Sequence, residues 1–218
     1  GDKREQWLTF RDWGCYEKFV KPAPLYPLNS VMHHGLVLGR HFQGAEVAKA
    51  GAEFKNAARS YFGTGANLLE LYLTPDLMTE KAWNQVAEAA KWAKQNEHIL
   101  IDSHWVGGDP LKLGIYGWAS WSEKKSILTL RNSSDEPREL TINMTEALEI
   151  PEGHTTRFKA TNAYPDQTYK EGPVEGNVTF KLKPFEVLCL GRGGRHRALV
   201  LQVRRPVRPV ERGRHRLL

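Results

Sequence analysis

The hydrophobic pattern changes its character near residue 110. Before that point, short apolar runs alternate with stretches in which apolar residues recur every three or four positions. After it, apolar and polar residues alternate in short segments that polar turns separate. The first pattern is typical of strands alternating with helices, and the second of antiparallel strands. The sequence therefore predicts an α/β part followed by an all-β part.

The α/β part contains two predicted strand–helix units. Its strands are the apolar runs at residues 28–39 and 67–75, and its helices are expected at residues 53–62 and 79–96. A further helix is expected at residues 4–20. The order of elements is therefore βαβα, and strands that alternate with helices in this way run parallel. Two strands are too few to close a barrel. One face of the 53–62 helix carries the apolar residues Phe54, Ala57, Ala58, Tyr61 and Phe62.

The all-β part has the period of two that half-buried strands show. In the run 138–144, the side chains of Leu140, Ile142 and Met144 are expected to point inward. Short strands at regular spacing predict a small antiparallel sandwich with a modest core of its own. Its strands are expected at residues 113–121, 126–132, 138–144, 155–161 and 177–191, the last run giving one or two strands.

Composition excludes several classes of protein and site. No run of 18 apolar residues occurs, so a membrane span is not expected, and the N-terminal residues show no signal-peptide pattern. The two cysteines, Cys15 and Cys189, are interpreted as separate thiols. His33 and His34 are neighbours in a predicted strand and point to opposite faces, so they do not indicate a metal site. No metal and no cofactor are expected.

The basic charge of the chain is concentrated at its end. From Gly191 onward the sequence has nine Arg, one Glu and no Lys, whereas the preceding residues are nearly neutral. Such a tail, residues 191–218, is expected to be disordered. It could bind nucleic acid without sequence preference, or it could be an extension without a selected function. The second alternative is favoured, so no specific nucleic-acid partner is expected.

Few polar residues stand out as candidates for chemistry. His33 and His34 are expected at the carboxyl end of the first strand, where α/β folds carry residues that face the substrate. A sugar contact and a purely structural role both remain open for them. The carboxylates Glu70, Asp76 and Asp102 lie near the ends of elements, but nothing fixes a catalytic pair, and helix capping accounts for Asp76. The segment 101–110, IDSHWVGGDP, is interpreted as a joint between the two parts.

Several longer blocks resemble a known family. They are YPLNSVMHHG, SYFGTGANLLELYLTPDLMTEKAW, AEAAKWAKQNEHILIDSHWVGGDP and YGWASWSEKKSILTLRNSSDEP. These blocks look like the C-terminal part of bacterial α-galactosidase-like, melibiase-related glycoside hydrolases, some of which carry the label "enterotoxin". The resemblance runs from about residue 4 to residue 190 and implies a (β/α)₈ barrel followed by an antiparallel β-sandwich.

On this resemblance, residues 1–110 form the last two βα units of the barrel, and residues 111–190 form the sandwich. The family's nucleophilic and acid/base aspartates follow its fourth and sixth barrel strands, so they are expected upstream of this chain. The resemblance therefore implies a retaining glycoside hydrolase acting on α-linked glycosides, and a chain that is inactive by itself.

The remaining expectations concern the ligand. His34 and Tyr72 are the residues expected to line the sugar pocket of a complete enzyme, so the expected partner is a carbohydrate. The alternative is a carbohydrate-binding or accessory module that works without hydrolysis. The sequence leaves the sugar, the linkage and the compartment open, and a secreted or periplasmic parent is one alternative.

Overall fold

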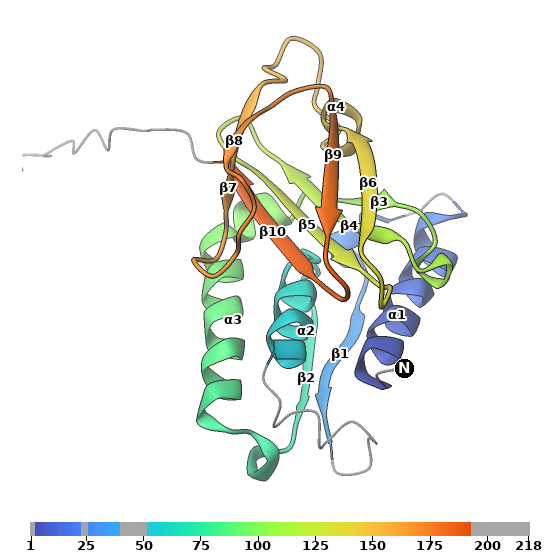
Figure 1. The fold of residues 1–218 in the computed structure, drawn as a ribbon, viewed down its shortest axis with the longest axis vertical. Coiled ribbons are helices and arrows are strands. Elements are labelled where there is room, and N and C mark those ends of the chain that lie inside the picture. The colour runs from blue at the N-terminus through green and yellow to red at the C-terminus, as the bar shows by residue number, and fades with distance from the viewer. Residues whose placement is uncertain (1–2, 23–25, 40–51, 193–218) are drawn as a thin grey trace, which may run out of the picture.

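The computed structural model describes residues 3–22, 26–39 and 52–192 (Figure 1). All three helices expected from the sequence are present, and the third continues four residues further than predicted. A π-helical turn, Tyr16–Val20, extends the first. The predicted basic tail lies outside the described residues, except for its first two residues, which belong to a strand. The helices are α1 (Lys3–Cys15), α2 (Ala52–Phe62), α3 (Glu80–Leu100) and α4 (Met144–Ala147).

The first part contains the predicted pair of parallel strands. β1 (His33–Leu38) and β2 (Leu69–Leu73) pair in parallel, with Leu36 opposite Leu71 and Leu38 opposite Leu73. The apolar face expected for α2 is buried against this pair. Thr79 caps α3, because its hydroxyl accepts a hydrogen bond from the Ala82 N–H at 3.1 Å. None of the described helices is long and apolar enough to cross a membrane.

The second part is antiparallel and consists of two sheets. One sheet has six strands in the order β3-β4-β5-β10-β7-β8, and the other pairs β6 with β9. The run 177–191 gives two of these strands. The strands are β3 (Ser103–Gly107), β4 (Ile115–Trp121), β5 (Ser126–Asn132), β6 (Arg138–Asn143), β7 (Phe158–Asn162), β8 (Gly172–Val174), β9 (Asn177–Leu182) and β10 (Val187–Arg192).

Two details correct the expectations from sequence. Half of the segment interpreted as a joint is strand β3, which pairs with β4 along its whole length, from Ser103 opposite Ser120 to Gly107 opposite Tyr116. Strand β10 runs into the predicted tail, because Gly191 and Arg192 pair with β7. In both places the cross-strand pairing, which the local sequence does not show, decides the structure.

Strand β5 shows that the large sheet is covered on both faces. All of its residues are buried. Leu128 and Leu130 point into the core shared with β6 and β9, whereas Ile127, Thr129 and Arg131 point to the opposite face, where α1, α2 and α3 lie (Figure 1). The sandwich was expected to bury a core of its own. Its large sheet also packs, with its other face, against the helices of the α/β part.

Close packing joins helix α2 to this sheet. A Cβ atom added to Gly63, just after α2, would lie 2.5 Å from the Thr129 hydroxyl oxygen, so only glycine fits between α2 and β5. Gly65, two residues later, has a positive φ of 76° and provides a left-handed turn after the helix. Nearby, Arg59 of α2 forms ion pairs with Asp166 and Glu88, and its guanidinium lies 3.9 Å from the Tyr164 ring centroid.

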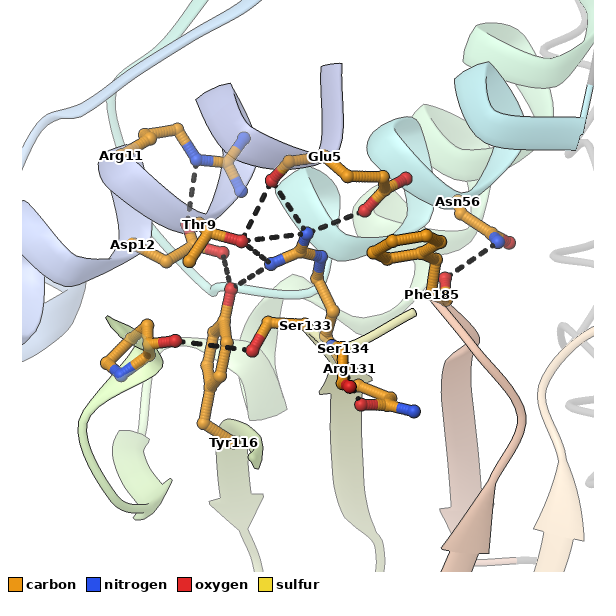
Figure 2. A network of polar contacts seen from close by, with 12 residues as sticks. Glu5, Thr9, Arg11, Asp12, Asn56, Tyr116, Arg131, Ser133, Ser134 and Phe185 are labelled. Atoms are coloured by element: carbon orange, nitrogen blue, oxygen red, sulfur yellow. Dashed lines mark hydrogen bonds and ion pairs between the residues drawn. The ribbon is translucent and has the colours of Figure 1, made fainter. Parts of the chain in front are cut away.

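A buried polar network joins helix α1 to the same sheet (Figure 2). Arg131 of β5 is fully buried, and its guanidinium donates to the Glu5 carboxylate at 2.6 Å and to the Thr9 hydroxyl at 3.1 Å. The Tyr116 hydroxyl donates to the Asp12 carboxylate at 2.6 Å and also accepts from Arg131. Arg11 pairs with the other oxygen of Asp12 at 2.7 Å. Two buried cations thus meet two buried carboxylates.

Both cysteines are free and buried, as the interpretation of separate thiols requires. Burial raises the pKa of the Cys15 thiol and of the Cys189 thiol to about 12. Both side chains are therefore uncharged at neutral pH and serve as small apolar core residues.

Replacing Arg131 with Met tests the buried network. The variant leaves the Glu5 and Asp12 carboxylates buried with one cation fewer, so we expect the free energy of unfolding to fall by about 3–5 kcal/mol. Urea denaturation followed by circular dichroism measures the change. The matched control is Arg138→Met, because Arg138 is an exposed arginine in β6 with an ion pair to Glu136. A loss of similar size in both variants would contradict the role of the network.

Candidate functional site

The two adjacent histidines lie at the start of β1 and not at its end. The apolar run that predicted the strand begins with a 3₁₀ turn, Leu28–Ser30, and the strand itself starts only at His33. The two side chains point to opposite faces, as expected: His33 is buried, and the side chain of His34 is 57% exposed. The expectation that these histidines mark the carboxyl end of a strand was therefore wrong.

The structure nevertheless brings the two predicted sugar-binding residues together. The ring centroids of His34 and Tyr72 lie 5.6 Å apart. Glu70 lies beside them, with its carboxylate 3.5 Å from the His34 Nδ1 atom. Trp7 of α1 meets His34 edge-on, with ring centroids 5.7 Å apart. We call these four residues, Trp7, His34, Glu70 and Tyr72, the aromatic cluster.

A glycine makes room for the aromatic cluster on the sheet. The Tyr72 ring lies across Gly35, so that a Cβ atom at this position would come within 2.3 Å of the Tyr72 ring. The pairing of β1 with β2 is irregular at the same place, between His33 and Leu36. The Tyr72 ring can therefore reach back along the strand to His34.

Tyr61 of α2 fixes the two strands beneath the aromatic cluster. Its buried hydroxyl accepts a hydrogen bond from the Glu70 N–H at 2.6 Å. The same hydroxyl lies within donating distance of two carbonyl oxygens, that of His33 at 3.1 Å and that of Glu70 at 3.0 Å. The Tyr61 side chain thus holds the backbone of both β1 and β2 next to the aromatic cluster.

The chemistry of the aromatic cluster suits binding. Tyr72 is 46% exposed, and a hydrogen bond to the Glu70 carboxylate raises the pKa of its hydroxyl. Exposed aromatic faces beside a carboxylate can stack on a sugar ring and accept hydrogen bonds from its hydroxyls. Hydrolysis of a glycosidic bond needs two carboxyl groups that face each other. In the part of the chain described here, the Glu70 carboxylate contacts His34 and Tyr72, not a second acid.

A second polar group surrounds His104 in strand β3. Its Nε2 atom lies 3.1 Å from the Asp102 carboxylate, and its Nδ1 atom lies 3.0 Å from the Glu149 carboxylate. Asp102 also accepts a hydrogen bond from the Trp121 N–H at 3.0 Å. The imidazole stands between the two acids, and all three side chains line a cavity of about 370 Å³.

Glu149 is a residue of this group that the sequence did not reveal. It has a positive φ of 47°, a conformation that only the structure shows. Asp76, by contrast, lies in the 3₁₀ turn Pro75–Leu77, and Thr79 caps the helix that follows. Among the residues that the structure describes, no three His, Cys, Asp or Glu side chains form a group that could hold a metal ion.

The buried His33 lies next to the aromatic cluster, and its pKa differs from the ordinary value of a histidine. Burial lowers the pKa of His33 to about 4, and the Arg11 guanidinium acts in the same direction, whereas Asp12 opposes it. Its ring meets the Trp118 ring edge-on, with centroids 5.7 Å apart. The neutral ring is therefore part of the contact between β1 and the large sheet.

Comparisons with known proteins show similarity of fold. No family profile matches the chain, and no curated protein sequence matches it. A GH27 β-L-arabinopyranosidase from Geobacillus stearothermophilus, solved in complex with arabinose, has a TM-score of 0.51 and 13% identity. The match covers 87% of this chain and 43% of that enzyme. Most of the chain therefore has the fold of a part of that enzyme.

Other similar structures match less of the chain. α-Galactosidase I from Mortierella vinacea has a TM-score of 0.45 and 13% identity over 64% of this chain and 35% of its own length. A protein from Bacillus halodurans described as a putative α-N-acetylgalactosaminidase has a TM-score of 0.44 and 11% identity. The match covers 65% of this chain and 32% of that protein. The chain spans roughly a third of the length of these proteins.

Gly35→Ala tests the packing of the aromatic cluster. The new methyl group overlaps the Tyr72 ring, which must move away from His34. We expect Tyr72 and His34 resonances to shift in two-dimensional NMR spectra, with a loss of stability of about 1–3 kcal/mol. Gly14→Ala is the matched control, because a Cβ atom there meets nothing within 4 Å. Unchanged Tyr72 and His34 resonances in Gly35→Ala would contradict the described packing.

The buried His33 predicts a pH dependence of stability. Below the ordinary pKa of 6.5, the unfolded chain binds a proton at His33 that the folded chain does not bind until about pH 4. The free energy of unfolding should therefore fall between pH 6.5 and pH 4, by up to about 3 kcal/mol, and this contribution should level off below that range. Urea denaturation at several pH values measures it. His33→Gln should remove most of this slope, whereas His98→Gln, in α3, should keep it.

Proposed function

We propose that this chain is the C-terminal part of a glycoside hydrolase that acts on α-linked glycosides, similar to α-galactosidases. In this proposal β1, β2 and their helices are the last two βα units of a (β/α)₈ barrel, and the antiparallel strands are the sandwich that follows. The single observation that supports it most is the fold match to the Geobacillus enzyme, which spans 87% of this chain and only 43% of the other.

The arrangement of the first part supports the barrel assignment. β1 and β2 are parallel, each is followed by a helix, and β2 has β1 as its sole partner among the described strands. Parallel strands with crossover helices need further strands to form a stable sheet. In a complete barrel, a further strand would pair with the outer edge of β2.

The aromatic cluster supports a sugar contact at His34 and Tyr72. The side chains lie on the exposed face of the parallel pair, next to Glu70, which can accept hydrogen bonds from sugar hydroxyls. We infer that these residues contribute to binding in the complete enzyme, and that the catalytic carboxylates come from the rest of the barrel. The chain alone is then inactive.

A second candidate function is a carbohydrate-binding module without hydrolysis. The exposure of His34 and Tyr72 in the chain as it stands favours it, because the cluster could bind sugar without a complete barrel. The two candidates differ in whether the chain by itself retains affinity for sugars.

Two assays test these proposals. We expect the purified chain to show no turnover of a chromogenic α-galactoside above the rate in buffer, because this proposal assigns the catalytic carboxylates to the rest of the barrel. Clear hydrolysis that survives repeated purification would contradict the assignment of catalysis to other parts of the barrel. Saturation-transfer NMR with free galactose then measures binding by the chain alone.

The binding assay needs a matched set of variants. If the cluster alone binds sugar, Tyr72→Ala and His34→Ala should each weaken binding roughly tenfold, as expected for a lost aromatic contact. Tyr26→Ala is the control, since Tyr26 is an aromatic residue that is 70% exposed and outside the cluster. Equal loss in all three variants would argue against a site at the cluster, and no binding would leave the enzyme-fragment assignment as the better one.

A further inference from the structure

The two outer edges of the parallel pair differ. Helix α1 covers the outer edge of β1, where the Arg4 guanidinium donates to the Val37 carbonyl at 3.2 Å and Leu8 packs into the core with Leu36. Strand β2, by contrast, pairs with β1 alone among the described strands. Its Leu71 is 48% exposed. An exposed apolar edge strand favours pairing with another strand.

The sequence of β2 is complementary to itself. It reads Leu-Glu-Leu-Tyr-Leu from residue 69 to residue 73. If two copies paired antiparallel about Leu71, that residue would face its own counterpart, Leu69 would face Leu73, and Glu70 would face Tyr72. Every pair would then be either two leucines or a carboxylate with a phenol, and no like charges would meet.

A groove beside β2 fits the side chains of such a partner. It has a volume of about 250 Å³ and lies between β2, the end of α2 and α3. Leu69 lines it together with Ala90 and Ala93. In the antiparallel arrangement the partner's Leu73 lies opposite Leu69, so its side chain would point toward this groove, which Asn67, Lys94 and Glu97 also line.

We propose that two copies of this chain form a symmetric dimer through antiparallel pairing of their β2 strands. The two-fold axis passes through Leu71, and the outer edge of β2 supplies the backbone hydrogen bonds. This inference goes beyond the proposed function, because it concerns the chain by itself. A barrel strand that occupied the same edge in a longer protein would compete with the second copy.

Sedimentation equilibrium of the 218-residue chain, at concentrations up to roughly 100 µM, measures the association. We expect a monomer–dimer equilibrium. Leu71→Lys places two like charges opposite each other at the axis and should weaken the dimer at least about 100-fold. The matched control is Leu68→Lys, which changes a leucine that is 57% exposed and lies just outside the strand. It should leave the dimer intact.

A disulfide test locates the axis independently of the Lys variant. In Leu71→Cys the two new thiols would face each other, so oxidation should give a covalent dimer. In Tyr72→Cys they would face Glu70 of the other copy and should cross-link far less. The native Cys15 and Cys189 are buried, so they contribute little background.

Three results would overturn the proposal. They are a wild-type chain that stays monomeric at the highest concentration, a dimer that Leu71→Lys leaves unchanged, and equal cross-linking of the Leu71→Cys and Tyr72→Cys variants. Circular dichroism of each variant establishes that it is folded. If Leu71→Lys is unfolded, the contrast between the two cysteine variants decides the question. None of these results depends on sugar binding or turnover.

Discussion

The buried guanidinium of Arg131 determines how the two parts of the chain fit together. A cation without water is tolerated only when carboxylates and hydrogen-bond acceptors surround it. Glu5, Thr9 and Tyr116 provide these groups around Arg131. Burial by itself would raise the pKa of Asp12, but the Arg11 and Arg131 guanidinium groups hold it below its usual value. Helix α1 must therefore lie against strands β4 and β5, in one orientation.

The position of the aromatic cluster follows from this arrangement. The large sheet holds α1 through the Arg131 network, and it holds α2 through the close contact of Gly63 with Thr129. Helix α2 in turn holds both parallel strands through the Tyr61 hydroxyl. The geometry of the cluster is thus set by side chains in a sheet that does not itself contribute to it. The exposed aromatic cluster on β1 and β2 is thus kept in place by the large sheet, which lies on the other side of helices α1 and α2.

Patterns of local sequence predicted much of the fold. The face of α2 and the bounds of β5 were both found, because periodicity is a local property. The start of β1 was missed, since the 3₁₀ turn Leu28–Ser30 runs directly into the apolar residues before the strand and the local sequence does not mark the boundary. Strands β3 and β8 were missed because they are short and are defined by their partners.

The polar networks could not be predicted in the same way. Arg131 and Glu5 are separated by 126 residues, and a charged residue in an alternating strand is expected on the surface. The proximity of His34 and Tyr72 was anticipated, but the contributions of Trp7 and Glu70 depend on the irregular pairing at Gly35. Such contacts between distant segments require the folded structure.

The buried network makes α1 and the large sheet one cooperative unit. Native-state hydrogen exchange measures this by comparing the opening free energies of amides in α1, such as that of Leu8, with those in β5, such as that of Leu130. We expect the most protected amides of both elements to exchange with the same free energy and the same dependence on denaturant. A helix α1 that opens at a much lower free energy, while β5 stays protected, would contradict it.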